Sequence, residues 1–456
     1  MKAMIKSLLL TFLILLSIYQ TAMLWFDYPS DRNFFYNIIG SGVSAKQNVS
    51  KLDYDLLFPK ELAYFSGSSP YLYARCNLSK SDNLNLLEST LQLIEIAFEE
   101  GSLEAEEMNL SQIWQEQHLM MILPNAYTGE RLLKDFMFKK SWILEEMEFF
   151  YIYIIPAQLG DEGLRIVFVN EEFSQSYSCL IETENIKLIN DKLISDMSRL
   201  EREKNEMYFS AKFEGIPLFP SEVLLPSTDQ SFNFLKTLYG KLAFYEDGER
   251  EEKAFYEFSD YFFVNPEDSW SMENEKEIRR GNIQALVRYD AEGFFEYSLI
   301  EEIEEKTVSV SDAYQIAEAF LSKDRLLSGI EYYFEDYEIL SDGIVFRYRY
   351  SYRDIPIHFG NVSQYSMKTP MEIKIRGSRV MNYKRLLWSG QDLLTQESPF
   401  RLRFQEPVDR WLEKQEHGNV AIDNLMICYQ IEKGSVNAKL GWTIDSERER
   451  YFIELE

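Results

Sequence analysis

The stretch EILSDGIVFRYRY, residues 338–350, decides the fold class of this 456-residue chain. The turn signal Ser-Asp-Gly at 341–343 is followed by residues that alternate with a period of two. This period places Ile344, Phe346, Tyr348 and Tyr350 on one face and Val345 on the other. Such alternation is typical of a half-buried strand in an antiparallel sheet, so we expect hairpins to dominate the fold.

Similar patterns lie on both sides of this stretch. We expect further strand pairs at 149–155 with 164–169, 371–375 with 380–385, and 438–443 with 450–455. Apolar residues at spacings of three and four predict helices over 82–100, 186–207, 232–242 and 419–429, and a helix carrying Ala313–Leu321 that Ser311 can cap. The fold class is therefore α+β, with mainly antiparallel sheets and packed helices.

Residues 8–26, LLLTFLILLSIYQTAMLWF, contain no charge and are long enough to cross a bilayer. Lys2 and Lys6 precede them and Asp27 and Asp31 follow, so the positive-inside rule puts the N-terminus in the cytoplasm and the rest outside. The alternative is a cleaved signal peptide, but no well-placed pair of small residues marks a cleavage site. We expect a single-pass membrane protein with an extracytoplasmic ectodomain.

Proline spacing and composition shifts suggest the domain boundaries. We predict a cytoplasmic tail (1–7), a transmembrane helix (8–26), a tether (27–48), an N-terminal ectodomain region (49–228), a middle α+β domain (229–305) and a C-terminal α+β domain (306–456). The 75 acidic and 47 basic residues give a net charge of −28. This charge argues against nucleic acid or an anionic lipid surface as a partner.

The sequence carries no recognisable catalytic or cofactor motif, so we expect no enzyme activity, cofactor or metal. The three histidines, His118, His358 and His417, are widely spaced. The three cysteines, Cys76, Cys179 and Cys428, show no disulfide framework, and we expect no structural disulfide. An envelope ectodomain that binds or hydrolyses a cell-wall polymer remains the alternative, because two carboxylates, or a carboxylate with a histidine, would suffice in a deep pocket.

The predicted transmembrane helix has a polar stripe. At 100° per residue, its small and amide-bearing residues gather on one side: Ser7, Thr11, Ser17, Gln20 and Thr21. Such residues let two helices approach closely and hydrogen-bond within lipid. We interpret the stripe as a contact for a partner helix, the alternative being that the hydroxyls bond back to their own backbone.

Several stretches together resemble the YycH-type regulators of Gram-positive bacteria. They are IKSLLLTFLILLSIYQTAMLWF (5–26), FFVNP (262–266), LVRYDAEGFFEYSL (286–299), AYQIAEAFL (313–321), FRYRYSYRDIPI (346–357) and EIKIRGSRVMNYKR (372–385). The resemblance covers most of the chain and is weakest in the first ectodomain region. It implies a multidomain α+β ectodomain whose C-terminal part is similar to the related YycI protein.

The resemblance also implies a function. A YycH-type protein is a non-enzymatic, membrane-anchored accessory of an essential cell-wall two-component system. Its expected partners are the sensor histidine kinase and a YycI-like co-regulator, contacted through transmembrane helices and an extracytoplasmic assembly. By this analogy the polar stripe would be the contact with the kinase or the co-regulator.

Overall fold

The computed structural model describes residues 59–455 with gaps at 60, 68–71, 77–80, 101, 107–112, 129–147, 159–162, 171–172, 174, 203–206, 213, 220–221, 228–230, 247–248, 301–307, 323, 328–330, 354, 392–397, 416–420 and 447–448. The predicted tail, transmembrane helix and tether (1–48) lie outside these residues. Among the helices that are described, none is both long and apolar enough to cross a membrane. Residues Leu56–Glu456 cluster as one compact unit.

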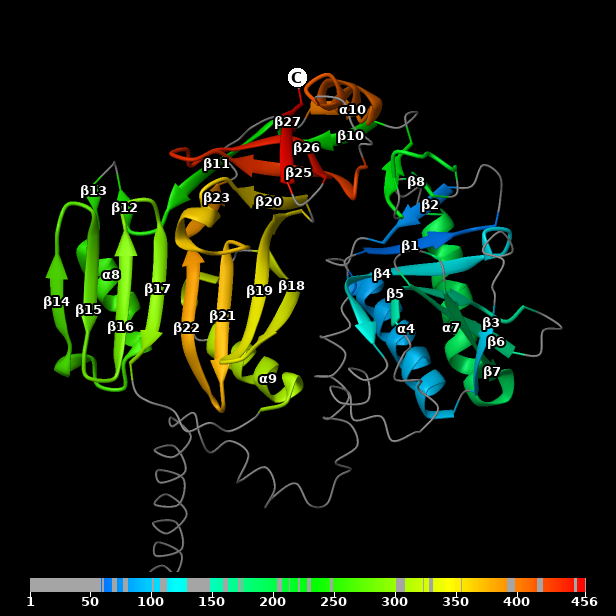
Figure 1. Ribbon diagram of the computed structural model, residues 1–456, viewed down its shortest axis with the longest axis horizontal. Helices are drawn as coiled ribbons and strands as arrows, with labels where there is room; N and C mark the ends of the chain where they lie inside the picture. The colour runs from blue at the N-terminus through cyan, green and yellow to red at the C-terminus, as the bar shows by residue number, and fades with distance from the viewer. Residues whose placement is uncertain are drawn as a thin grey trace, which may run out of the picture. The chain divides into compact units, whose positions relative to one another are not determined.

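The first half of this unit is a nine-stranded antiparallel sheet, in the order β3-β7-β6-β5-β4-β1-β2-β8-β9 (Figure 1). Its strands are β1 (Glu61–Phe65), β2 (Leu72–Arg75), β3 (Ser102–Glu106), β4 (His118–Thr128), β5 (Glu148–Ile155), β6 (Gly163–Val169), β7 (Ser176–Glu182), β8 (Met207–Ser210) and β9 (Leu224–Pro226). The predicted hairpin of 149–155 with 164–169 is confirmed as β5 and β6, which pair from Tyr151↔Val169 to Ile155↔Arg165.

Two long helices pack against this sheet, α4 (Ser81–Glu100) and α7 (Thr183–Arg202). The predicted helix over 82–100 is confirmed as α4, whose buried side chains include Leu87, Leu91 and Phe98 at helical spacing. The helix predicted over 186–207 ends earlier, at Arg202, because the chain enters β8 at Met207 and pairs there with β2.

The second half is built on a fourteen-stranded sheet, in the order β14-β15-β16-β17-β22-β21-β19-β20-β25-β26-β11-β23, with β18 beside β19 and β27 beside β26. Its strands are β11 (Thr237–Leu242), β14 (Trp270–Glu273), β15 (Glu277–Gly281), β16 (Ala285–Asp290), β17 (Phe294–Leu299), β18 (Glu331–Leu340), β19 (Gly343–Tyr352), β20 (Ile355–Phe359), β21 (Met371–Arg376), β22 (Arg379–Leu386), β23 (Trp388–Gln391), β25 (Asn424–Ile431), β26 (Ala438–Ser446) and β27 (Glu449–Glu454). Among the described strands, β20 and β25 pair in parallel and all other pairs are antiparallel.

Short elements complete this half. Two small pairs join β10 (Ser231–Phe234) to β24 (Ser398–Arg401) and β12 (Tyr245–Glu246) to β13 (Glu249–Arg250). The helices are α8 (Glu252–Ser259), α9 (Val310–Leu321) and α10 (Gln405–Leu412), with 3-10 turns at η1 (Asp260–Phe262), η2 (Pro266–Asp268), η3 (Arg325–Leu327) and η4 (Val362–Tyr365).

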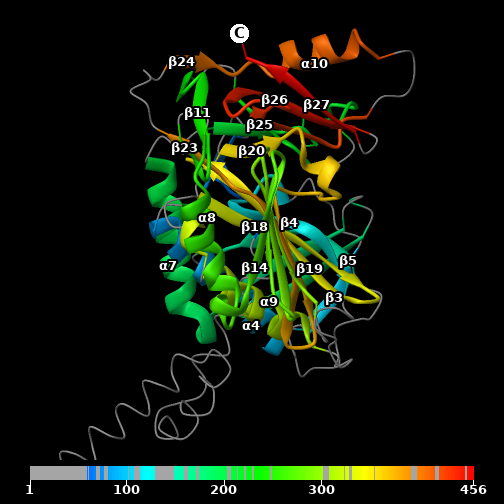
Figure 2. The ribbon, with the colours of Figure 1, turned by 90° about the vertical axis from the view of Figure 1, so that its left-hand side faces the viewer.

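Both α8 and α9 cover the same face of the large sheet. Phe255 of α8 stacks on Tyr289 of β16, and Tyr314 of α9 contacts Phe346 of β19. Figure 2 views these strands nearly edge-on, with α8 beside them. The predicted α+β class, dominated by antiparallel sheet, is confirmed. The predicted middle and C-terminal regions share this one sheet through β17 and β22, while the predicted domain boundaries themselves stay predictions.

Two predicted helices are wrong. Residues 232–234 and 237–242 lie in β10 and β11, and residues 424–429 of the predicted 419–429 helix belong to β25 (Asn424–Ile431). Strand pairing overrides the helical spacing, because β25 is inserted between β20 and β26, where its backbone groups bond on both sides. At Gly240 of β11, a Cβ would lie 1.9 Å from Trp388 Nε1, so close strand approach requires glycine there.

The cap of α9 is also different from the prediction. Ser309 is the N-cap, not Ser311, and its hydroxyl accepts a hydrogen bond from the Asp312 N–H at 3.0 Å. The Ser309 hydroxyl in turn donates to the Asp312 carboxylate at 2.8 Å. This reciprocal arrangement favours the earlier serine because it satisfies a helix N–H with a side chain that is itself held in place.

The hairpin at 338–350 is confirmed as β18 and β19, with one departure from simple alternation. Arg347 and Arg349, which lie on the Val345 face, are 5% and 6% exposed. Arg347 bonds to Asp336 and Glu338, and Arg349 pairs with Glu335. The carboxylates of β18 neutralise both guanidinium groups, which allows β19 to be buried on both sides.

A cluster of apolar side chains, which we call the junction cluster, joins the loop between β8 and β9 to the large sheet. Its buried members are Ala211, Phe219, Val223, Leu225, Leu402, Phe404, Val408, Trp411, Ile422, Leu425, Trp442 and Ile444. The Ile422 N–H also donates to the Leu218 carbonyl at 2.8 Å. The two halves of the unit therefore share a core as well as a chain connection.

Candidate functional site

The predicted transmembrane contact lies outside the described residues, with all five of its members: Ser7, Thr11, Ser17, Gln20 and Thr21. His417 lies outside them too. Across the residues whose positions are described, no group of three or more His, Cys, Asp or Glu side chains could hold a metal ion. The remaining candidates among the described residues are their buried charged groups and a surface hollow.

His118 is buried on β4, where its imidazole forms hydrogen bonds within the core. Its Nδ1 lies 2.8 Å from the Glu116 carbonyl oxygen. Because a carbonyl oxygen can only accept a hydrogen bond, Nδ1 carries the proton and donates it. Nε2 therefore accepts a hydrogen bond from the Tyr73 hydroxyl at 3.0 Å. Burial lowers the pKa of His118 to about 4. The imidazole is thus neutral at physiological pH and joins β1–β2 to β4 as a hydrogen-bonded core residue.

His358 is buried on β20 between two arginines. Its Nδ1 accepts from Nη1 of Arg349 at 2.7 Å and from Nη1 of Arg450 at 2.9 Å. Burial, and then the charges of Arg349 and Arg450, hold the pKa of His358 well below its usual range. Since Arg349 pairs with Glu335 and Arg450 with Asp445, this neutral imidazole links two ion pairs and is not placed for proton transfer.

The pair of Asp324 and Arg385 is a buried charge constellation that the sequence motifs did not reveal. Both side chains are fully buried, and Nη1 of Arg385 lies 2.6 Å from Oδ2 of Asp324. The Tyr383 hydroxyl donates to the same carboxylate at 2.8 Å, and Arg385 Nε donates to the Tyr350 hydroxyl at 3.0 Å. Alternation along β22 places Arg385 on the same face as Tyr383, so the sequence pattern indicates that the arginine points into the core.

The three cysteines are free thiols in separate parts of the core. Burial raises the pKa of Cys76 to about 12, of Cys179 to about 11 and of Cys428 to about 12. Protonated, buried thiols behave as small apolar side chains and not as nucleophiles.

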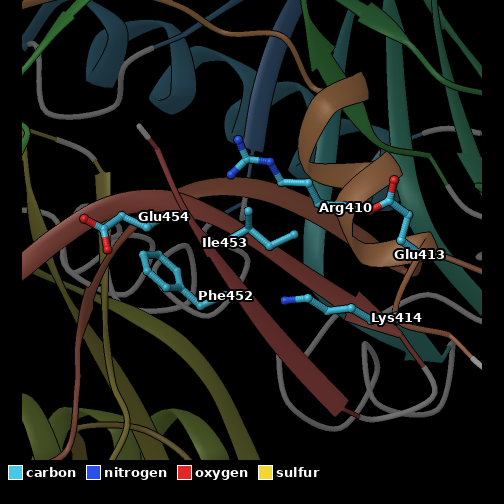
Figure 3. A pocket seen from close by; sticks show the side chains of 6 residues that line it. All are labelled: Arg410, Glu413, Lys414, Phe452, Ile453 and Glu454. Carbon is cyan, nitrogen blue, oxygen red and sulfur yellow. The ribbon is translucent and has the colours of Figure 1, made fainter.

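A surface hollow of about 640 Å³ lies between α10 and β27 (Figure 3). It is lined by Arg410, Glu413, Lys414, Phe452, Ile453 and Glu454. In the close view, Glu454 and Lys414 stand at opposite sides, with Phe452 and Ile453 between them. Glu454 bonds to Lys439 at 3.0 Å and Arg410 to Glu406 at 2.8 Å.

The lining of the hollow combines two apolar residues, Phe452 and Ile453, with charged residues of both signs. This composition suits a peptide segment, whose apolar side chains and charges it could match. The sequence did not single it out, because its residues come from a helix and a strand about 40 positions apart in a chain where carboxylates and cations are common.

Comparison with known proteins gives a likeness of fold. No family model matches the chain, and no curated protein does. Among solved structures, YycH from Bacillus subtilis is similar over 88% of this chain and 96% of its own, with 13% identity and a TM-score of 0.53. The Bacillus megaterium YpeB C-terminal domain matches 45% of this chain and 92% of its own, with 13% identity and a TM-score of 0.25. The described residues thus have a YycH-like fold.

Proposed function

We propose that this protein is a non-enzymatic, membrane-anchored regulator of a cell-wall-sensing two-component histidine kinase, acting through transmembrane and extracytoplasmic contacts. The observation that carries the proposal is the YycH-like fold across 88% of the chain. The six stretches that resemble YycH-type proteins support it from the sequence. The partners in this proposal are the sensor kinase and a YycI-like co-regulator.

The chemistry of the described histidines agrees with a role in binding. His118 and His358 are both neutral and engaged in core hydrogen bonds, so neither is poised as a general base. The hollow between α10 and β27 is an amphipathic surface, as expected of a protein that contacts other proteins.

Regulation by such a protein follows from differential binding. A kinase balanced between two arrangements of its helices responds to a partner that binds one arrangement more tightly. A difference of about 1–3 kcal/mol changes the equilibrium about 5–150-fold. The proposed location is the cell membrane, with residues 1–7 in the cytoplasm and the ectodomain outside.

The test is a crosslinked pull-down of the full-length protein from membranes, beside a version with residues 1–26 replaced by an unrelated anchor. A histidine kinase and a second single-pass protein should be recovered with the native anchor and fade with the foreign one. Recovery of neither with the native anchor would refute the proposal and favour a wall-binding ectodomain.

A sharper variant changes Ser7, Thr11, Ser17 and Thr21 together to leucine. Leucine side chains would fill the face on which small residues let two helices approach closely. We expect this variant to lose co-purification with the kinase and still to insert into the membrane. The matched control exchanges apolar residues on the opposite side of the helix, in L9V, F12L, L16V and M23L, and should keep full binding. Full binding by the leucine variant would exclude the stripe as the contact.

A further inference from the structure

Exposed apolar side chains are concentrated in one part of the ectodomain. Twelve large hydrophobic side chains are exposed among the described residues, and six of them lie between Tyr261 and Ile300. Four of these belong to one corner of the large sheet: Trp270 (49% exposed), Met272 (47%), Ile283 (92%) and Ile300 (56%). Exposed apolar groups gathered in this way mark interaction surfaces more often than scattered ones do.

Strand pairing places these four residues toward one end of strands β14 to β17, and we name them the β14 corner. Trp270 pairs with Gly281 and Met272 with Arg279, so both side chains project from the same face of β14. Ile283 is two residues beyond Gly281 in the turn that leads to β16. The Ile300 N–H donates to the Gln284 carbonyl at 2.7 Å, which brings Ile300 to the same end of the sheet.

Trp270 is held in position although it is half exposed. A Cβ on Gly281 would lie 2.8 Å from Cζ2 of Trp270 and 3.2 Å from Cδ1 of Leu286. The indole therefore lies directly over the glycine with Leu286 nearby. An aromatic side chain that is ordered before binding loses little conformational entropy on contact, which is a property of interface anchors.

The backbone of β14 is open on the side away from β15. β14 is the first strand in the order of the large sheet, and no described strand pairs with its other side. The Asn274 N–H donates to the Glu277 carbonyl at 3.0 Å, so hydrogen-bonded pairs recur at Met272 with Arg279 and at Trp270 with Gly281. The N–H and C=O of Ser271, which lie between these pairs, consequently point toward the open edge.

The negative charge beside β14 favours a partner with basic side chains. Residues 267–276, EDSWSMENEK, carry four carboxylates and one lysine, and the whole chain has a net charge of −28. Arg279 and Arg280 of the neighbouring β15 pair with Glu277 and Asp260, outside this stretch. A second copy of this chain would bring like charges together at the edge. A segment with basic side chains would instead be attracted to it.

We propose that β14 is a docking edge for an extended segment of another protein, with apolar side chains that face Trp270 and Met272 and basic side chains between them. Such a segment would add to the sheet as a strand, with main-chain hydrogen bonds at Ser271 and alternate side chains for specificity. This inference deepens the proposed function and rests on it, since it gives the ectodomain a surface for a signalling partner.

The probe is a synthetic, end-capped eight-residue peptide that alternates valine and lysine. Full-length protein in membranes carries a photocrosslinking amino acid at position 272, or at the exposed Leu188 of α7 as a control. We expect adducts with the peptide at position 272 only, and none with peptides in which serine replaces valine or glutamate replaces lysine. A band at twice the protein mass would assign the edge to a second copy, and a lipid adduct would assign it to the membrane; either result overturns the proposal.

Two variants test the geometry by fluorescence anisotropy of the labelled peptide. Trp270→Ala removes the anchor and should weaken binding about tenfold or more. Ser271→Pro removes an edge N–H without breaking a bond to β15 and should also abolish binding, whereas Leu188→Ala should not. Equal binding by all three variants overturns the proposal. Because the kinase pull-down is read separately, failure of the peptide to bind leaves the proposed function standing.

Discussion

Glu222 provides a test of how burial in the first half of the described chain affects an ionisable side chain. It lies just before β9, beside the junction cluster, and is 6% exposed. Its Oε2 accepts a hydrogen bond from the Ser210 hydroxyl at 2.7 Å, and its backbone N–H donates to the Tyr151 hydroxyl at 3.1 Å. Burial raises the pKa of Glu222 to about 8 from its ordinary value of 4.5.

This pKa fixes the sign of the pH dependence. Between about pH 4.5 and about pH 8 the folded protein keeps a proton on Glu222 that the unfolded chain releases. Folding is therefore favoured at the acidic end of this window and loses stability as the pH rises. From about pH 5.5 to about pH 7, these two pKa values correspond to a loss of roughly 2 kcal/mol in the free energy of unfolding.

The perturbation is Glu222→Gln, which keeps the size and the acceptor for Ser210 but cannot ionise. We expect the wild type to lose roughly 2 kcal/mol more than this variant over that pH range. Urea unfolding followed by tryptophan fluorescence at both pH values measures the difference, and other titrating groups cancel. Glu214→Gln, an exposed glutamate of the same loop, is the matched control and should follow the wild type. Parallel losses in the wild type and Glu222→Gln would show that Glu222 is already ionised when folded.

Three further outcomes are expected. Arg385→Met should lower the free energy of unfolding by roughly 3–5 kcal/mol because it leaves the buried Asp324 charge uncompensated, and adding Asp324→Leu should restore much of it in urea unfolding. Phe219→Ala should cost roughly 3–5 kcal/mol and increase hydrogen exchange in both the 211–223 loop and β25, whereas unchanged exchange in β25 would contradict a shared core. His118→Gln should flatten the pH profile of the thermal midpoint between about pH 4 and about pH 6.5. In this range the unfolded wild-type chain binds a proton at His118 and the folded protein does not, so acidification destabilises the wild type. An equally steep profile in the variant would refute this.

Several elements were predictable because their signals are local. The hairpins β18–β19 and β21–β22 follow from alternation around short turns, and α4 follows from apolar residues at helical spacing. The same local rule failed at β25, where Ile422, Leu425, Met426 and Tyr429 also fit a helix. The competing effect there was non-local, since β25 completes the sheet between β20 and β26.

The candidate surfaces show the same division. The alternation of β22 marks Arg385 as inward, but its partner Asp324 is 61 residues away and has no local signal. The hollow between α10 and β27 and the β14 corner both combine residues whose side chains are common in the sequence. The tertiary structure brings the residues of the hollow together from a helix and a strand, and strand order places the β14 corner at an open edge.

The sequence by itself determined the α+β class, the principal hairpins and the amphipathic helix α4, because periodicity and turn residues act over a few positions. The expectation of a YycH-like fold came from the resemblance of six stretches to YycH-type proteins. Only the tertiary structure decided which charges are buried as pairs, which strand remains an edge, and that a loop of the first sheet shares a core with the second. These features depend on contacts between segments far apart in the chain, where the free energy comes from burial and pairing that no single segment contains.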